Sequence, residues 1–491
     1  MLFPLNPHFR KIASAVLLTE LRPHQQRVVD KLRRNSVLAA HGMGAGKTLA
    51  SIGAAVELGM PVQVIAPTSL TGNYEKEVAK HVSGDLPVNV TSIGKAVRQN
   101  LAPEPGLVVL DEGHNFRNPG TSRSQYLRDP SIFGKDHRLL LLTGTPAYNQ
   151  VSDIAPLLNA VHGDEVVPQD PAAFNEEYIE NEKISPGLLG KLLGVAPGEV
   201  PHLKNKEKLR ELFRDHVDYY ETGKEGFPKR EEEVIETPLS SSQHNLYRYI
   251  DERLPFWARY KVKHNLPPSK AEAKQLNSFL QGLRQISLSE AAHDKTITPE
   301  DAAARSGKLS RALDEIQRLK ESDRNFRAFI YSNYMKAGLE PMRAALERKG
   351  IESEILHGGL SAKERTELVR RYNNGELPVL LGSSAAAEGL DLKGTKLVQI
   401  LDPHFNNSRI EQAVGRGIRY KSHDHLPPEE RRVIVQRYLS TLPKGMLSAL
   451  QKRRYSVDEN IASRAKSKDE LAAELKQLMR EATEDYDRHV S

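Results

Sequence analysis

A chain of 491 residues is too long for one ordinary core, so two or three domains are expected. Hydrophobic residues make up 38% of the chain and charged residues 27%, which is typical of a globular protein and excludes a fibrous one. The net charge of +6 suits a polyanionic partner, and the lack of cysteine excludes disulfides, thiolate zinc sites and cysteine nucleophiles.

The first part of the chain alternates short aliphatic runs with helical patterns, which is the order expected of a parallel sheet covered by helices. The alternation stops near residue 169, and charged helical segments dominate from there to residue 305. One of these segments places a set of apolar residues on a single helical face: Leu276, Phe279, Leu280, Leu283 and Ile286. The runs expected to form strands are 36–40, 62–66, 107–110 and 139–142.

A second alternation of strands and helices begins after residue 306 and predicts a second α/β domain. Its strand candidates are 328–331, 353–356, 379–381 and 397–401. The helical tail from residue 457 carries an apolar stripe that we expect to dock on the second domain: Leu471, Leu475, Leu478 and Met479. We therefore predict a first domain over 1–168, a helical region over 169–305 and a second domain over 306–491. No apolar stretch approaches the roughly 20 residues that span a bilayer, so we expect no membrane contact and a cytoplasmic, intracellular or virus-associated protein.

A glycine-rich segment, His41 to Thr48, follows the first predicted strand and opens a helix, as a phosphate-binding loop must. Its main-chain N–H groups would face the phosphates of ATP, Lys47 would place its charge beside them, and Thr48 would bind Mg²⁺. The strict pattern has Gly where His41 stands, so the match is to a variant centred on Gly44 to Thr48. A glycine-rich turn with an incidental lysine is the alternative. The predicted ATP-binding residues of the loop are Gly42, Met43, Gly44, Ala45, Gly46, Lys47 and Thr48.

Two adjacent carboxylates, Asp111 and Glu112, follow the apolar strand 107–110. Ligands bind at the carboxyl edge of a parallel sheet, and phosphoryl transfer needs one carboxylate for the metal and another for water. Asp111 is therefore predicted to bind Mg²⁺ and Glu112 to activate the attacking water. A solvated turn is the alternative for this pair.

Together these segments resemble the superfamily-two helicases and, more closely, their Swi/Snf-type branch. Residues 21–25 resemble the segment that reads adenine, with Gln25 as the reader, and residues 65–70 resemble the next family motif. In that family the loop at Pro67 and Thr68 faces the tracked strand. The order and spacing of the segments from residue 111 to residue 149 also match the family.

The second domain carries further segments of the same family pattern. Residues 329–332 resemble motif IV, 383–392 motif V and 412–419 motif VI. Arg416 and Arg419 are three residues apart, so on a helix they would share a face and enter one cleft as arginine fingers. Two solvated arginines on a basic helix are the alternative. The resemblance implies nucleic-acid contacts at Ser332, Ser383 and Ser384, nucleotide contacts at Gly389 and Asp391, and catalytic roles for Gln412, Arg416 and Arg419.

The resemblance implies two RecA-like lobes with helical insertions, which hydrolyse ATP with Mg²⁺ and step along a nucleic acid, with DNA favoured over RNA. The loop at Lys47 and the helix bearing Arg416 must then meet across one nucleotide. Residues 420–427 and 456–459 are similar to poxvirus-type and phage nucleoside triphosphatases, which makes a polymerase or another nucleoprotein complex a candidate partner. The basic and aromatic residues from Trp257 to Lys274 either grip a strand or form a solvated face.

Two other classes of function compete with a motor. The chain could be a nucleotide-switch scaffold on a nucleoprotein complex, although a pure switch need not keep Glu112, Arg416 and Arg419. It could also be the ATPase subunit of a nuclease or restriction assembly, although the sequence shows no separate cluster of acidic metal ligands and no spare domain.

Overall fold

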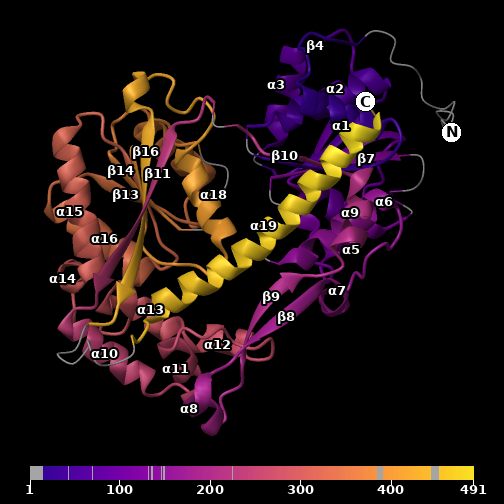
Figure 1. Cartoon of the computed structure of the whole chain (residues 1–491). Coiled ribbons are helices and arrows are strands. Elements are labelled where there is room, and N and C mark those ends of the chain that lie inside the picture. Colours follow the sequence, from indigo (N-terminus) through magenta and orange to yellow (C-terminus); the bar gives the residue numbers. More distant parts are fainter. Residues whose placement is uncertain are drawn as a thin grey trace. The chain divides into compact units, whose positions relative to one another are not determined.

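The structure is a computed structural model that describes residues 15–42, 44–68, 70–130, 132–133, 137–144, 146, 150–223, 225–383, 391–443 and 453–490. The chain forms two compact units (Figure 1). The first takes its described residues from 1–180, 201–223 and 470–491, and the second from 181–200 and 224–469. Both units are therefore assembled from segments that are far apart in the sequence.

The first unit is built on a six-stranded sheet in which all neighbouring strands are parallel. Its central strands are buried along their length, as expected when helices cover both faces. The four predicted strands are confirmed, and two more extend the sheet at its edges. In order across the sheet the strands are β10 (Val217–Tyr220), β2 (Val37–His41), β7 (His137–Thr143), β6 (Gly106–Asp111), β3 (Val62–Ala66) and β5 (Val88–Ser92).

Each face of this sheet has its own core, because alternate residues of a strand point to opposite sides. Leu38 and Ala40 of β2 belong to one core, and Val37 and Ala39 belong to the other. The core at Val37 is completed by α1 (Pro23–Leu32), α2 (Lys47–Leu58) and α3 (Thr71–His81). The core at Leu38 is completed by α4 (Ile93–Gln99), α5 (Ser122–Arg128), α6 (Ala155–His162), α7 (Pro171–Tyr178), α9 (Lys206–Arg214) and part of α19 (Val457–Val490).

The contribution of α19 to the first unit corrects a prediction. The apolar stripe of Leu471, Leu475, Leu478 and Met479 packs in the core of the first unit, and not on the second domain as expected. The helical pattern identified the buried face correctly, but a pattern does not name the surface that covers it. A helix of 34 residues is about 50 Å long at 1.5 Å per residue. Its residues up to Asp469 belong to the second unit and those from Glu470 onward to the first.

Leu475→Ala is expected to lower the free energy of unfolding of the first unit by about 2–5 kcal/mol, because it opens a cavity in a close-packed core. Leu475 is fully buried. Urea unfolding followed by hydrogen exchange of β2 and β7 would measure the loss. Lys476→Ala, at the exposed neighbouring position, is the matched control. Equal stability of the two variants would contradict the packing of α19 described above.

The second unit is built on another six-stranded parallel sheet. Its four predicted strands are confirmed. Two unpredicted strands, β11 and β16, pair over ten residues at one side of it, and β11 is an edge strand rich in charged side chains. In order the strands are β11 (Lys229–Pro238), β16 (Arg432–Thr441), β15 (Leu397–Ile400), β12 (Ala328–Tyr331), β14 (Val379–Gly382) and β13 (Ser353–Leu356).

The helical region predicted before residue 305 contributes mainly to the second unit. Its apolar face forms, but two short helices carry it, α12 (Ala273–Phe279) and α13 (Gln281–Leu288). Leu276, Leu280, Leu283 and Ile286 are buried there, whereas Phe279 is exposed. The other helices of this unit are α8 (Gly187–Leu192), α10 (Ser241–Asp251), α11 (Phe256–Lys263), α14 (Pro299–Arg305), α15 (Gly307–Ser322), α16 (Glu340–Arg348), α17 (Ala362–Asn373) and α18 (Asn407–Gly417).

Two small two-stranded sheets complete the described chain. One pairs β1 (Val16–Leu17) with β4 (Val82–Ser83) in antiparallel fashion, and the other pairs β8 (Ile179–Ile184) with β9 (Gly198–Leu203). Among the helices in the described ranges, none combines the length and the apolar character that a bilayer crossing requires.

Candidate nucleotide site

The glycine-rich loop lies between the end of β2 and the start of α2, at the carboxyl edge of the first sheet. Gly44 and Gly46 have φ angles of 77° and 74°, a region that glycine enters without strain. The Lys47 ammonium donates to the main-chain oxygens of His41 at 3.0 Å and Gly42 at 3.2 Å. The loop therefore curls around its own lysine at a helix N-terminus, the arrangement that suits a bound phosphate. Met43 lies outside the described residues.

Gln25, predicted to read adenine, holds this loop from the side of α1. Its Nε2 donates to the main-chain oxygens of Ala45 and Gly46, both at 3.1 Å, and its Oε1 accepts from the N–H of Arg22 at 2.9 Å. A Cβ atom on Gly46 would lie 2.4 Å from Gln25 Nε2, so the close packing also requires a glycine there. Both amide hydrogens of Gln25 are thus occupied in this structure, and its role as the adenine reader stays a prediction.

The acidic pair stands two strands away on the same sheet edge. β7 separates β2 from β6, with Thr143 paired to Ala40 and Leu142 paired to Asp111. Asp111 Oδ1 accepts the N–H of Glu112 at 2.9 Å, and Glu112 Oε2 lies 3.2 Å from Nδ1 of His114. The strands therefore bring the predicted metal and water residues to the edge that carries the phosphate loop.

Glu112 has a left-handed backbone, with φ of 52° and ψ of 51°. A residue with a side chain rarely adopts this conformation, and such strain collects at functional sites where neighbouring bonds hold it in place. Here the Glu112 carbonyl accepts from both the main-chain N–H and the side-chain amide of Asn115, each at 2.9 Å. The turn is thereby fixed with its carboxylate half-exposed at the sheet edge.

Burial, followed by the charge of Glu112, raises the pKa of Asp111 from its usual 3.8 to about 6, while Lys47 opposes the shift. Because burial and the neighbouring carboxylate disfavour the negative charge of Asp111, a cation beside it would stabilise that charge. Asp111 and Thr48 supply the oxygen ligands that Mg²⁺ prefers, and the phosphates of a nucleotide would complete its shell. The residues present therefore fit a magnesium ion bound together with ATP.

Asp111→Asn is expected to stabilise the metal-free and nucleotide-free protein at pH 7.5 by about 1 kcal/mol, after allowance for solvent screening at this half-buried group. Between pH 3.8 and about 6 the folded protein holds a proton that the unfolded chain has released. Its stability therefore falls as the pH rises through that window, and the penalty is complete above it. Urea unfolding in EDTA at pH 7.5 and pH 4 measures the difference. A gain that persists at pH 4 would contradict this cause.

The predicted catalytic residues of the second domain lie on and after α18. Gln412 and Arg416 are on this helix, and the main-chain oxygen of Arg416 accepts from the N–H of Leu392 at 3.1 Å. The helix ends at Gly417, so Arg419 lies beyond it and its N–H donates to Ser422 Oγ at 3.2 Å. The expectation that both arginines share a helical face is therefore wrong. Gly417 packs closely against Thr395, where a Cβ atom would lie 3.1 Å from its methyl group, and the helix stops there.

Two family models match the chain, and together they reach both units. The SNF2-related domain matches residues 104–292, and the helicase conserved C-terminal domain matches residues 307–421. The chain belongs to the SNF2-related helicase family. It is accordingly an ATP-dependent helicase or translocase with two RecA-like lobes, one on each six-stranded sheet. The first match begins after the phosphate loop, so the loop is identified by its own geometry.

Relatives of this SNF2-related helicase align over most of its length. A protein of Acanthamoeba polyphaga mimivirus named as an ATP-dependent RNA helicase is 28% identical over 94% of this chain and 97% of its own. A termination factor NPH-I homolog of African swine fever virus is 25% identical over 91% of this chain and 75% of its own. The solved SWI2/SNF2 ATPase core of Sulfolobus solfataricus in complex with dsDNA is 20% identical over 94% of this chain and 97% of its own, with a TM-score of 0.36.

The predicted nucleic-acid contacts of this SNF2-related helicase differ in their surroundings. Pro67 is half-buried and Thr68 exposed directly after β3. Ser332 is fully buried, and its hydroxyl donates to Asp402 Oδ1 at 2.6 Å. That hydroxyl serves the interior of the second unit and is not presented to a strand. Ser383 is half-buried after β14, whereas Ser384 and Gly389 lie outside the described residues.

The basic and aromatic segment on α11 is largely a structural feature of the SNF2-related helicase. Lys261 is buried, and its ammonium bonds to Glu272 Oε2 at 2.5 Å. Lys263 pairs with Asp251 at 2.8 Å, and the Tyr260 hydroxyl donates to the main-chain oxygen of Pro186 at 2.9 Å. These groups are already paired within the protein, which disfavours the strand-gripping alternative for them.

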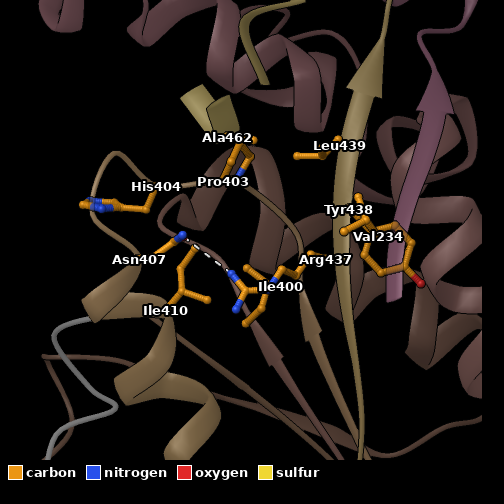
Figure 2. Close-up of a pocket in the computed structure, with 10 residues that line it drawn as sticks. All are labelled: Val234, Ile400, Pro403, His404, Asn407, Ile410, Arg437, Tyr438, Leu439 and Ala462. Carbon is orange, nitrogen blue, oxygen red and sulfur yellow. Dashed lines mark hydrogen bonds between the residues drawn. The ribbon is translucent and has the colours of Figure 1, made fainter. Parts of the chain in front are cut away.

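A cavity of about 170 Å³ in the second unit lies beside the start of α18 (Figure 2). Arg437 of β16 reaches across it to α18, donating to Asn407 Oδ1 at 3.5 Å and to Glu411 Oε1 at 2.5 Å. The cavity lining includes Asn407 and Arg437 but not Arg416. Its polar contacts therefore fix the helix that carries the predicted finger.

Sequence reasoning missed a buried polar group behind the phosphate loop of the SNF2-related helicase. Asp218 of β10 is fully buried and contacts His41, Arg27 and Lys31. The four-residue strand Val217–Tyr220 was hidden in a region that reads as helical. The signal in the sequence that could have found it is an aspartate placed between an apolar residue and two aromatic residues, Val217, Tyr219 and Tyr220.

Proposed function

We propose that this helicase is a nucleic-acid-stimulated ATPase that binds ATP and Mg²⁺ at the carboxyl edge of the first sheet and steps along duplex DNA. The observation that carries the proposal is the placement of the Lys47 loop and the Asp111–Glu112 pair on nearby strands of one edge. A nucleotide switch needs a phosphate loop, but it does not need a glutamate whose strained main chain places its carboxylate to orient water.

Each residue of the edge has a distinct role in this proposal. Lys47 and the N–H groups from Gly44 to Thr48 bind the phosphates, and Thr48 and Asp111 hold the metal ion. The bound ion would neutralise charge that develops on the phosphates. Glu112 orients the attacking water and accepts its proton, and the oxygen leaving the γ-phosphate carries away the bond's electron pair.

The residues of α18 supply the second half of the proposed reaction. We assign Arg416 and Arg419 as the groups that stabilise the transferring phosphoryl when the lobes close, with Gln412 beside them and Gly389 and Asp391 contacting the nucleotide. Closing and reopening would shift two strand-binding surfaces relative to each other, so that hydrolysis drives stepping. Pro67, Thr68 and Ser383 are the contacts proposed for the strand.

DNA is proposed as the track because the Swi/Snf-type resemblance favours duplex translocation, although three relatives are named as RNA helicases. The name of another relative, a termination factor, suits a motor that displaces a polymerase or another nucleoprotein complex. Such an output needs translocation but not strand separation.

The proposal is tested by ATPase stimulation with duplex, single-stranded and branched DNA and with RNA, each at several salt concentrations. We expect duplex DNA to stimulate most, with a stimulation that weakens as salt rises because phosphate contacts release counterions. Displacement of a triplex strand from duplex DNA would then report translocation. Stimulation by RNA alone would overturn the choice of track, and ATP binding without turnover on any nucleic acid would favour the switch.

A further inference from the structure

The phosphate loop of this protein departs from its pattern at His41, and the histidine has a specific buried partner. His41 ends β2 and is fully buried, and its Nε2 donates to Asp218 Oδ1 at 2.6 Å. β10 brings the aspartate there, because Asp218 pairs with Ala39 and Tyr220 with His41 in the parallel register. The first residue of the loop is therefore tied to a strand about 180 residues away in sequence.

The carboxylate of Asp218 is held by two cations of α1. Arg27 Nε lies 2.5 Å from Oδ2, and the fully buried Lys31 Nζ lies 3.8 Å from the same atom. Burial alone would raise the pKa of Asp218, but the bond from His41 and the charges of Lys31 and Arg27 hold it well below its usual range. The group is thus a charged, paired cluster, and removal of one partner would leave another buried charge uncompensated.

The same helix contacts the loop at a second point. His24 Nε2 lies 2.9 Å from the main-chain oxygen of Ala45, and because a carbonyl can only accept, the histidine donates. Its ring stacks on Tyr220 with 3.6 Å between centroids and parallel planes. α1 and β10 therefore hold the loop at His41 and at Ala45, so a shift of either element moves the phosphate-binding groups.

The last turns of α19 fasten α1 and β10 in turn. Asp487 Oδ2 lies 2.9 Å from Arg27 Nη1, and Thr483 Oγ1 accepts the N–H of Tyr219 at 3.0 Å. Lys31 Nζ lies 4.4 Å above the ring of Tyr486. One turn of helix therefore touches both elements that hold the loop.

We propose that Thr483, Tyr486 and Asp487 are positioning residues for the phosphate-binding loop, acting through Arg27 and Asp218 on His41, and that they set the affinity for a nucleoside triphosphate. The inference rests on the proposed function, because it takes the Lys47 loop as the triphosphate site. It adds that the carboxyl-terminal helix belongs to the binding apparatus as well as to the core. None of the three residues needs to touch the nucleotide.

The experiment uses the full-length chain and compares Asp487→Asn with wild type in ATPase kinetics and in titration with a fluorescent ATP analogue. We expect KM and the analogue Kd to rise about 3- to 30-fold with kcat within about twofold, the size of coupling found inside hydrogen-bonded networks. Asp487→Glu should restore both constants. Glu484→Gln removes the same charge at an exposed position of the same helix and serves as the matched control.

Asp218→Asn tests the buried end of the chain of contacts. It keeps an acceptor for His41 but removes the charge that holds Arg27 and Lys31, so a larger rise in KM is expected, with a melting temperature measured alongside. The Asp487 carboxylate is half-exposed, so its replacement spares the fold and keeps the test decisive if Asp218→Asn does not fold.

The outcomes separate this inference from the function on which it rests. Wild-type protein that fails to bind the ATP analogue would end the proposed function. Wild-type binding together with an Asp487→Asn affinity equal to that of Glu484→Gln would overturn the positioning role alone. A fall in kcat at unchanged KM and Kd would also overturn it.

Discussion

Replacing Glu112 with glutamine is expected to lower kcat for ATP by about 10²- to 10⁴-fold, the contribution typical of a positioned general base. Glutamine preserves the size and the main-chain turn of Glu112 but cannot accept the proton of water. The Kd for ATP should change little, because Lys47 and the glycine loop carry the phosphate contacts in the proposed site. Single-turnover hydrolysis and equilibrium binding on the same preparation measure the two quantities.

Glu104→Gln makes the same chemical change at an exposed position before β6 and should keep wild-type turnover. Near-normal hydrolysis by Glu112→Gln would show that Glu112 is not the general base. If Glu112→Gln instead lost ATP binding to the same extent as turnover, Glu112 would contribute to the binding of ATP and not to the chemical step.

Replacing Arg416 with alanine is expected to lower kcat by about 10³- to 10⁵-fold, as for arginine fingers elsewhere, with ATP binding to the first lobe largely retained. The guanidinium would stabilise charge that appears only as the phosphoryl group transfers, so its removal affects the transition state more than the bound substrate. Rapid-mixing hydrolysis in the presence of saturating duplex DNA measures the loss.

Arg409→Ala removes an exposed arginine from the same helix and is the matched control. Arg419→Ala is informative beside it, because Arg419 follows the end of α18 and is held by Ser422. If Arg416→Ala retained turnover within about tenfold of wild type, Arg416 would not be the arginine finger that the proposed two-lobe mechanism requires.

The strands that could be predicted were those whose sequence is buried on both faces. β2, β3 and β6 read as apolar runs because helices cover each side of the sheet. β11 was missed because it lies at a sheet edge and consists mainly of charged residues, so its composition resembles that of a solvated helix. Its ten-residue pairing with β16 depends on a partner about 200 residues later, which local propensity does not contain.

The candidate site was likewise predictable only where its signals are local in the sequence. The phosphate loop and the acidic pair were predictable because glycine spacing and strand-end carboxylates are local signals. Asp218 was not, because its importance comes from a contact with His41 across 177 positions. The helical spacing of Arg416 and Arg419 misled for a related reason: α18 ends at Gly417, between the two arginines, and spacing alone does not show where a helix ends.

The placement of Leu475 and Met479 in the first core has a consequence for biosynthesis. A nascent chain completes the strands of the amino-terminal lobe by residue 220, yet the side chains that close its core are translated about 250 residues later. At a synthesis rate of about 5–20 residues per second, that interval lasts on the order of 10–50 seconds. During that interval the core residues that Leu475 and Met479 cover would remain exposed to solvent, and exposed apolar surface of this kind is what makes a partly synthesised chain prone to aggregate.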